Sequence, residues 1–200
     1  MDEFNLFSTK TVEVLRQPME SGHILIDRVN GKVEYPADFM LVAAMNPCKC
    51  GYYPDRNKCS CTPAQVRAYF GRLSRPLLDR IDVCVQVPRI KYGDMVYDGK
   101  DLYTNEYMRS TVERVFNIQK ERFADEKYSL NSVIPAADVS RYCILDREAE
   151  NLMNSIYDSC DLSARGYHKL LKVARTIADI DGSEYIMAEH ICEASGYRMV

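Results

Sequence analysis

The 200-residue chain is 46% hydrophobic and 28% charged, which describes a globular protein with room for one large domain or two small ones. Its formal net charge of -3 supplies no overall basic field, so any contact with nucleic acid must depend on a local patch. No stretch approaches the roughly 18 to 20 apolar residues that a membrane helix needs, and residues 1–20 lack a signal-peptide pattern. We therefore expect a cytoplasmic protein that does not enter the membrane.

The first half of the chain has the pattern of a mixed α/β domain. Apolar residues at helical spacing predict a helix from Thr9 to Glu20. Asn30-Gly31 lies between two short strand-like runs and predicts a β-hairpin over residues 23–35. Residues 39–45 and 81–87 are almost continuously apolar, and each run is followed by a proline. That pattern predicts parallel strands buried on both faces.

The second half of the chain has a helical pattern. Residues 93–104 contain two glycines and mixed charge, so we predict a linker there, between domains at 1–92 and 105–200. Helical periodicity then predicts these helices: Asn105 to Glu126, Ala136 to Tyr142, Asp146 to Tyr157, Ser163 to Ile180 and Met187 to Arg198. The fourth of these carries one continuous apolar stripe. This half is predicted to be a helical bundle.

Four of the eight cysteines are clustered in a C-x-C-x8-C-x-C pattern, namely Cys48, Cys50, Cys59 and Cys61. Four thiolates can close a tetrahedral zinc site, and Gly51 and Pro54 allow the loop between them to fold back. The alternatives are four reduced cysteines in a surface loop, or a disulfide in an oxidised protein. We expect structural zinc, because a small loop with little apolar content usually needs a staple. A catalytic zinc is disfavoured, because a four-sulfur site leaves no open position for water.

Four polar residues are candidates for a second site, namely Asp2, Glu3, Asn46 and Arg80. Asn46 directly follows a predicted buried strand, and open α/β sheets place their sites at the carboxyl ends of strands. Each residue also has an ordinary interpretation. Acids at a terminus are usually solvated, asparagine commonly ends a strand, and Arg80 can pair with Asp79 or Asp82. Their order along the chain is therefore more informative than any one of them.

Several motifs together resemble the magnesium-chelatase-like AAA+ ATPases, in the same order. In chain order they are Asp2-Glu3, Val14 to Gly22, Ala43 to Cys48, Pro76 to Asp82, Leu162 to Tyr167, Leu171 to Asp179, His190-Ile191 and Tyr197-Arg198. The likeness covers nearly the whole chain apart from residues 91–135. The cysteines that follow Met45-Asn46-Pro47 are similar to the competence-type branch rather than to the pigment-synthesis chelatase subunits.

The resemblance implies a role for each polar residue in an ATP site. Asp2 matches the Walker B aspartate that holds Mg²⁺, and Glu3 matches the glutamate that orients the attacking water. Asn46 matches sensor 1, which holds the same water. Arg80 matches the arginine finger that reaches the ATP of a neighbouring subunit, and Arg165 matches sensor 2. Residues 23–35 resemble a hairpin that faces the central pore in related hexameric motors.

The resemblance also implies a fold: a partial α/β AAA+ core, with an incomplete parallel sheet and an inserted β-hairpin, followed by an all-α lid bundle. The chain departs from the family in two places. It contains no G-x-x-x-x-G-K-[ST] phosphate loop, and Phe4 to Phe7 replace a run similar to Leu-Pro-Glu-Phe. We therefore expect this chain alone to bind and hydrolyse no ATP. We also expect exposed apolar strand edges, which favour self-association.

For the intact form, the resemblance implies a homo-oligomeric, hexameric ring that couples ATP hydrolysis to remodelling of DNA in competence or recombination. The DNA assignment is an analogy, because a fold does not determine its substrate. A local basic and aromatic patch gives it modest support, formed by Arg67, Arg72, Arg75, Arg80, Tyr69 and Phe70. The alternative is that this patch is an intersubunit surface. Two alternatives stay open: a non-catalytic, zinc-stapled module that binds nucleic acid or protein, and a magnesium-chelatase ATPase subunit. The cysteine loop argues against the second.

Overall fold

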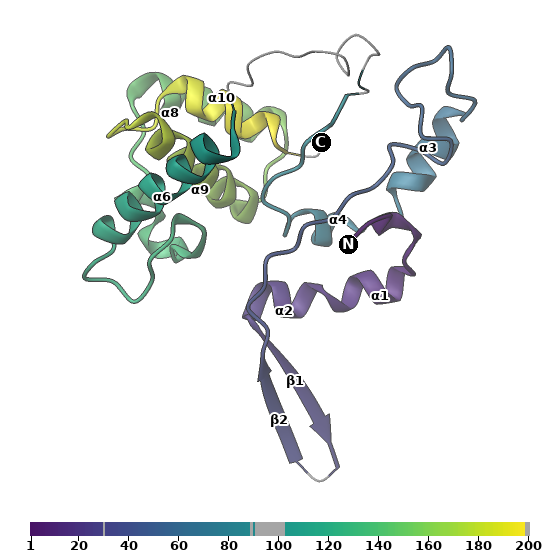
Figure 1. The fold of residues 1–200 in the computed structure, drawn as a ribbon, viewed down its shortest axis with the longest axis horizontal. Coiled ribbons are helices and arrows are strands. Elements are labelled where there is room, and N and C mark those ends of the chain that lie inside the picture. Colours follow the sequence, from purple (N-terminus) through teal and green to yellow (C-terminus); the bar gives the residue numbers. More distant parts are fainter. Residues whose placement is uncertain (30, 89, 91–102, 199–200) are drawn as a thin grey trace. The chain divides into compact units, whose positions relative to one another are not determined.

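The computed structural model describes residues 1–29, 31–88, 90 and 103–198 and divides into two compact units (Figure 1). Unit 1 spans Met1–Ile81 and unit 2 spans Asp82–Val200. Most of the predicted linker, residues 93–102, lies outside the described residues, as does Asn30 of the predicted hairpin turn. Within the described ranges, each helix is too short or too polar to cross a bilayer.

The first predicted helix is present in unit 1 but is interrupted once. It forms as α1 (Thr9–Val14) and α2 (Arg16–Ser21), with the break at Leu15. Pro18 explains the break, because proline has no N–H to donate to the carbonyl of Val14 four residues earlier. The sequence therefore predicted the extent of this helix but not its interruption.

The predicted hairpin follows α2 directly. Strands β1 (His23–Arg28) and β2 (Gly31–Pro36) pair antiparallel, and Figure 1 shows them as a two-stranded ribbon that extends from the end of α2. Residues that pair directly share a face. One face is therefore apolar, with Ile24 opposite Tyr35 and Ile26 opposite Val33. These four side chains are 37–51% exposed, so this face has no apolar cover in unit 1.

The prediction of a parallel sheet is wrong for the described residues, where the only sheet is the β1–β2 hairpin. Residues 39–45 and 81–87 form no strand. Most of their side chains are exposed and none is fully buried, with Met40 at 87%, Val42 at 70% and Val87 at 81%. Burial on both faces requires neighbouring strands and covering helices. Within unit 1, residues 42–44 have strand-like main-chain hydrogen bonds only to Met1 and Phe4.

The remaining elements of unit 1 are short. They are η1 (Phe4–Leu6), α3 (Pro63–Phe70) and α4 (Arg75–Leu78). A small apolar cluster joins η1, α1 and α4, and its buried members are Phe4, Val12, Leu73 and Leu77. A second buried cluster forms around the cysteine loop and α3. Both clusters are small, so unit 1 has only a limited apolar core.

Unit 2 is helical, as predicted. Its elements are α6 (Asn105–Arg122), η2 (Asn131–Val133), η3 (Ala136–Asp138), α7 (Val139–Tyr142), α8 (Arg147–Ser159), α9 (Ala164–Asp181) and α10 (Ala188–Gly196). All five predicted helical segments are confirmed, with ends that differ from the predicted ones by at most four residues.

Helix α9 is the centre of unit 2 and packs against α6, α7, η2 and α10. Its predicted apolar stripe is buried in the core, through Leu170, Leu171, Ala174, Ile177 and Ala178. A single main-chain bridge between Leu145 and Ile186 ties the start of α8 to the segment before α10. The opposite, less buried face of α9 carries the cationic residues described below.

Candidate functional site

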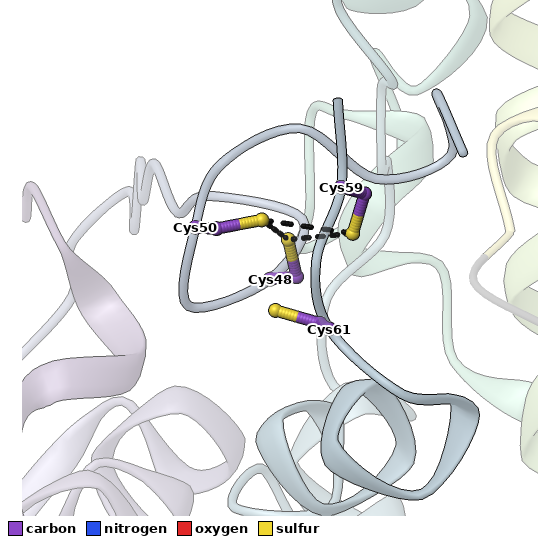
Figure 2. Close-up of side chains that lie close together, drawn as sticks. All are labelled: Cys48, Cys50, Cys59 and Cys61. Atoms are coloured by element: carbon purple, nitrogen blue, oxygen red, sulfur yellow. Dashed lines mark hydrogen bonds between the residues drawn. The ribbon is translucent and has the colours of Figure 1, made fainter. Parts of the chain in front are cut away.

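The structure brings the four predicted metal ligands together (Figure 2). The Sγ atoms of Cys48, Cys50, Cys59 and Cys61 all lie within 4.8 Å of one another. Among Cys48, Cys50 and Cys59 the sulfur separations are 3.3 Å for Cys48–Cys50, 3.6 Å for Cys50–Cys59 and 3.8 Å for Cys48–Cys59. All four cysteines are free thiols, so the disulfide alternative is not realised in this structure.

These separations fit a tetrahedral zinc site. A Zn–S bond of about 2.3 Å places the sulfurs of a regular tetrahedron about 3.8 Å apart. The separations of 3.3–3.8 Å are close to that edge length. Cys48 and Cys59 are buried, while Cys50 and Cys61 are partly exposed. The donor set therefore suits a closed structural site with two ligands toward the core and two toward solvent.

Local structure holds the cysteine loop in shape from both ends. At the first pair, Gly51 adopts a φ of 78°, a left-handed conformation that favours glycine. At the second pair, Thr62 follows Cys61 and caps α3. The Thr62 Oγ1 accepts the N–H of Gln65, and the Gln65 side chain accepts the N–H of Thr62, which forms a capping box. The second ligand pair is thus anchored to the start of a helix.

The thiols differ in how readily they ionise. The backbone N–H of Tyr52 lowers the pKa of Cys50 to about 6. Burial raises the pKa of Cys48. The N–H of Tyr53, 3.4 Å from the Cys48 sulfur, and further hydrogen bonds have a larger opposite effect, so the pKa of Cys48 lies below its ordinary value. Burial raises the pKa of Cys59 to about 11. A ligand set that contains a readily ionised thiol suits a cation, because binding the cation favours loss of the remaining protons.

Main-chain hydrogen bonds place the first residue of the chain beside residues 42–44. Met1 N donates to Val42 O at 2.6 Å, and Ala44 N donates to Met1 O at 2.9 Å. Together these two bonds have the pattern found between parallel strands, in which one residue, here Met1, bonds to the two residues on either side of its partner, residue 43. A third bond, from Phe4 N to Ala44 O at 2.9 Å, continues the contact.

Asp2 and Glu3 lie between these bonded residues, and Asn46 follows Ala44 by two positions. All three candidates are exposed. The Asp2 carboxylate accepts the N–H of Glu3 at 2.8 Å, and Glu3 has a φ of 49°, which is strained for a residue with a side chain. The structure therefore brings the segments that carry Asp2, Glu3 and Asn46 together through their backbones.

Arg80 is folded back onto unit 1. Its Nη2 forms an ion pair with Glu20, its Nη1 donates to the Pro76 carbonyl, and its side chain is only 12% exposed. It lines an open polar cleft of about 460 Å³ with residues of α1 and α2. The partners considered from the sequence, Asp79 and Asp82, did not include Glu20. Asp82 instead lies 2.6 Å from Lys169 within unit 2.

Arg165 lies in the first turn of α9 in unit 2 and is half-buried. Three further cations affect one another's charge there, namely Lys169, Lys172 and Arg198, and no individual role was predicted for any of them. Their spacing was a usable signal, because residues 165, 169 and 172 fall on one face of a helix.

The basic and aromatic patch predicted in unit 1 is only partly available. Arg80 is committed to Glu20, and Arg72 donates to the Asn5 carbonyl at 3.4 Å. Tyr69 and Phe70 pack edge to face, with ring centroids 6.3 Å apart. Two of the four predicted cations are thus engaged in contacts within the unit.

Comparison with known proteins identifies the family. The model described as magnesium chelatase, subunit ChlI, matches residues 1–95, and the model described as magnesium chelatase, subunit ChlI C-terminal, matches residues 103–198. The competence protein ComM of Haemophilus influenzae is 38% identical over 198 residues, which are 99% of this chain and 38% of that protein.

Two further relatives agree. The uncharacterized protein YifB of Escherichia coli is 37% identical over 200 residues, covering 100% of this chain and 38% of its own length. An uncharacterized protein of Mycobacterium bovis is 31% identical over 198 residues, covering 99% of this chain and 39% of its own length. The chain thus spans about two fifths of the length of the curated relatives it matches. The chain belongs to the magnesium-chelatase-like family, in its ComM-type branch.

Proposed function

We propose that this chain contributes one part of a Mg²⁺-ATP site in an AAA+ ring ATPase of the ComM type. In this proposal, Asp2 holds Mg²⁺, Glu3 orients the attacking water and Asn46 assists it as sensor 1. Arg80 acts on the ATP of a neighbouring subunit, and Arg165 is the sensor 2 cation. A homo-oligomer, taken as a hexameric ring, is required because a finger acts across a subunit boundary.

One observation carries the proposal. The parallel pattern of hydrogen bonds between Met1 and residues 42–44 brings the Asp2-Glu3 and Asn46 segments next to each other. Nucleotide sites of open α/β sheets lie at the carboxyl ends of neighbouring parallel strands. Two acids and an amide beyond such a pairing are the groups needed to hold a metal ion and a water.

The contact of Arg80 with Glu20 adds a requirement to this proposal. A finger must present its guanidinium to another subunit, whereas Arg80 is paired within its own unit. The proposal therefore requires Arg80 to exchange Glu20 for a phosphate oxygen when the ring assembles. Glu20 is 49% exposed, so a neighbouring subunit can approach the pair.

We propose DNA as the substrate of the ring. The support is the name of the Haemophilus relative, which associates that protein with competence, together with the exposed β1–β2 hairpin. The four-cysteine site is proposed to hold zinc in a structural role, since its donor geometry suits a closed tetrahedral site.

A chimaera tests the catalytic assignment. The matching 198 residues of the Haemophilus ComM are replaced by this chain, and Mg²⁺-dependent ATP hydrolysis is measured for the chimaera and for the 200-residue chain alone. We expect hydrolysis by the chimaera, and neither hydrolysis nor micromolar ATP binding by the chain alone. Glu3→Gln and Arg80→Ala each reduce the chimaera's kcat by about 100-fold or more.

The matched control in the chimaera is Arg67→Ala, which removes another cation of unit 1. We expect it to leave ATP hydrolysis unchanged. The assignment fails if a folded, assembled chimaera hydrolyses no ATP, or if hydrolysis is insensitive to Glu3 and Arg80. Micromolar ATP binding by the chain alone also contradicts it.

A second candidate function is a self-contained binding module stapled by zinc, which the convergence of the four thiols favours. This module would act without nucleotide. It is favoured over the ATPase assignment if zinc removal abolishes DNA binding by the chain alone while the chimaera remains inactive toward ATP.

A further inference from the structure

The cysteine loop, residues 48–61, belongs to a strongly basic stretch of unit 1. Residues 39–78 contain six lysine and arginine residues but only one acid, Asp55, although the whole chain has a net charge of -3. Three of the six cations lie inside the loop, namely Lys49, Arg56 and Lys58, and all three are exposed. They are called the loop cations below. Positive charge that is hidden in the composition of the whole chain is therefore concentrated around the metal ligands.

The thiols bring two of the loop cations close to each other. Lys49 lies between Cys48 and Cys50, and Lys58 directly precedes Cys59. The sulfurs of these three cysteines lie within 3.8 Å of one another (Figure 2). Both lysines therefore extend from one small folded loop, although nine positions separate them in the sequence. A ligand with several negative charges can contact both.

Arg56 is held in the same loop by two contacts. Its Nη1 donates to the Cys61 carbonyl at 3.4 Å, and its Cζ lies 5.1 Å from the centroid of the Tyr53 ring. A guanidinium has five N–H donors, so this hydrogen bond leaves others for a ligand. The ring restricts the side chain before a ligand arrives, which lowers the entropy cost of binding.

The one acid of the loop engages only one of the loop cations, and weakly. Asp55 Oδ2 lies 3.9 Å from Lys58 Nζ, and the two side chains are 40% and 60% exposed. Exposed ion pairs of this kind contribute little, because water screens them. Within the part of the chain that the structure describes, Lys49 and Arg56 form no ion pair. All three loop cations are therefore accessible to an external anion.

The ordinary explanation of the loop cations is that they only balance the metal centre, because Zn²⁺ with four thiolates carries two negative charges. Their contacts do not support it. Among the described residues, none of the three cationic groups donates to a cysteine sulfur. The Cys48 sulfur instead accepts the main-chain N–H of Tyr53 at 3.4 Å. The loop thus stabilises its thiolates through the backbone and leaves its cations exposed.

We propose that the loop cations bind the sugar–phosphate backbone of DNA, independently of base sequence, and that zinc is the staple that holds them together. This names a contact surface for the proposed DNA substrate, and it rests on the proposed function for DNA rather than RNA. Interfaces with nucleic acid are polar and positively charged, whereas the core of a protein interface is apolar. Residues 48–61 contain no leucine, isoleucine, valine, methionine or phenylalanine. This composition favours a phosphate backbone over an acidic protein.

The test titrates the reduced, zinc-loaded 200-residue chain into a short fluorescent DNA, single-stranded or duplex, and follows anisotropy at several salt concentrations. The expected Kd is on the order of 100 µM at low salt, because about three phosphates are contacted. Lys49→Gln, Arg56→Gln and Lys58→Gln each weaken binding by about fivefold. Each also reduces the slope of log K against log salt by about one for the duplex and slightly less for the single strand.

Three variants complete the test. Lys49→Arg retains the charge and is expected to retain binding. Lys10→Gln removes the same charge from α1, where Lys10 is exposed outside the loop, and is expected to leave binding unchanged. Asp55→Asn keeps a side-chain acceptor for the Asn57 N–H but removes the one acid of the loop, so binding should tighten by about threefold. Elemental analysis measures the zinc content of every variant.

The proposal is overturned if the zinc-loaded chain binds no DNA, if Lys10→Gln weakens binding as much as the loop variants, or if Asp55→Asn fails to tighten it. Loop variants that lose zinc, but bind DNA as wild type does when zinc is saturating, assign the cations to the metal centre alone. Poly-glutamate bound as tightly as DNA overturns the choice of partner.

The outcome is separable from that of the chimaera. An active chimaera together with a chain that binds no DNA overturns the role of the loop and leaves the ATPase assignment standing. Insensitivity of the chimaera's ATP hydrolysis to Glu3 and Arg80 removes the proposed function and leaves DNA binding by the loop cations to be judged by these titrations.

Discussion

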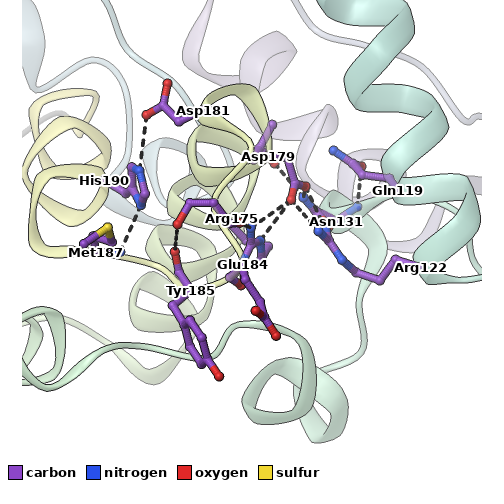
Figure 3. A network of polar contacts seen from close by, with 12 residues as sticks. Gln119, Arg122, Asn131, Arg175, Asp179, Asp181, Glu184, Tyr185, Met187 and His190 are labelled. Carbon is purple, nitrogen blue, oxygen red and sulfur yellow. Dashed lines mark hydrogen bonds and ion pairs between the residues drawn. The ribbon is translucent and has the colours of Figure 1, made fainter.

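The Arg175 guanidinium lies 3.0 Å from the Asp179 carboxylate one turn further along α9, and both side chains are almost completely buried (Figure 3). Asp179 also accepts hydrogen bonds from Arg122 of α6 and from Asn131 of η2, the latter at 2.8 Å. Arg175 donates in addition to the carbonyl of Glu184 at 2.7 Å. The pair thus connects α9 to α6, to η2 and to the segment before α10.

Replacing Asp179 is expected to destabilise unit 2 strongly. Asp179→Asn leaves the buried Arg175 guanidinium and the partly exposed Arg122 guanidinium without their counter-charge, which costs about 3–5 kcal/mol. Asp158→Asn in α8 removes an exposed carboxylate and is expected to change stability by less than about 0.5 kcal/mol. Urea denaturation followed by circular dichroism measures both. Equal stability of the two variants would show that the pair contributes nothing.

The same network predicts a dependence of stability on pH. Burial opposes ionisation of Asp179, but hydrogen bonds from Arg122 and Asn131 and the charge of Arg175 outweigh it, so its pKa lies below the ordinary value of 3.8. A carboxyl whose pKa is lowered in the folded state stabilises the fold fully at a pH above its ordinary pKa. This stabilisation is lost as the pH falls through the lowered pKa of the folded state. The gap in unfolding free energy between wild type and Asp179→Asn should therefore narrow below about pH 4. A gap that stays constant down to acid unfolding would contradict this.

Zinc should be bound by the reduced protein at about one equivalent per chain. Cys48→Ser and Cys61→Ser are expected to lose the metal and to unfold at a lower temperature. For a chain of this size, each kcal/mol lost from the free energy of unfolding lowers the Tm by about 2–4 °C. Cys160→Ser removes an exposed thiol outside the cluster and should change neither value. Elemental analysis and thermal unfolding provide the measurements. Absence of metal, with no loss of stability in the two cluster variants, would exclude the site.

The cap of α3 should influence the metal site, because Thr62 directly follows Cys61. Thr62→Ala removes the side-chain bond to the Gln65 N–H and is expected to cost about 1 kcal/mol, or about fivefold in zinc affinity if the loop orders with the metal. Ser60→Ala, between the two cysteines, is the control, and its affinity should stay within about twofold of wild type. Competition with a chromophoric chelator measures both. Equal zinc affinities of Thr62→Ala and Ser60→Ala would show that the helix cap does not influence the metal site.

The local structure of this protein followed from the sequence. The five helical segments of unit 2, the hairpin around Gly31 and the cysteine ligand set were predicted because periodicity, turn residues and ligand spacing act over a few neighbouring residues. Residues 39–45 and 81–87 were misjudged for the complementary reason. A buried parallel strand has the same apolar pattern whether or not its neighbours are present, and here those side chains are exposed.

Only the tertiary structure decided which charged residues meet. The sequence by itself indicated Arg80 and Arg165 as candidates, but it did not pair Arg80 with Glu20 or Lys169 with Asp82, nor bring Arg198 to Gly166. The last contact joins residues 32 positions apart. Such pairs depend on how helices pack and on which side chains that packing removes from water, and neither is encoded in the spacing of nearby residues.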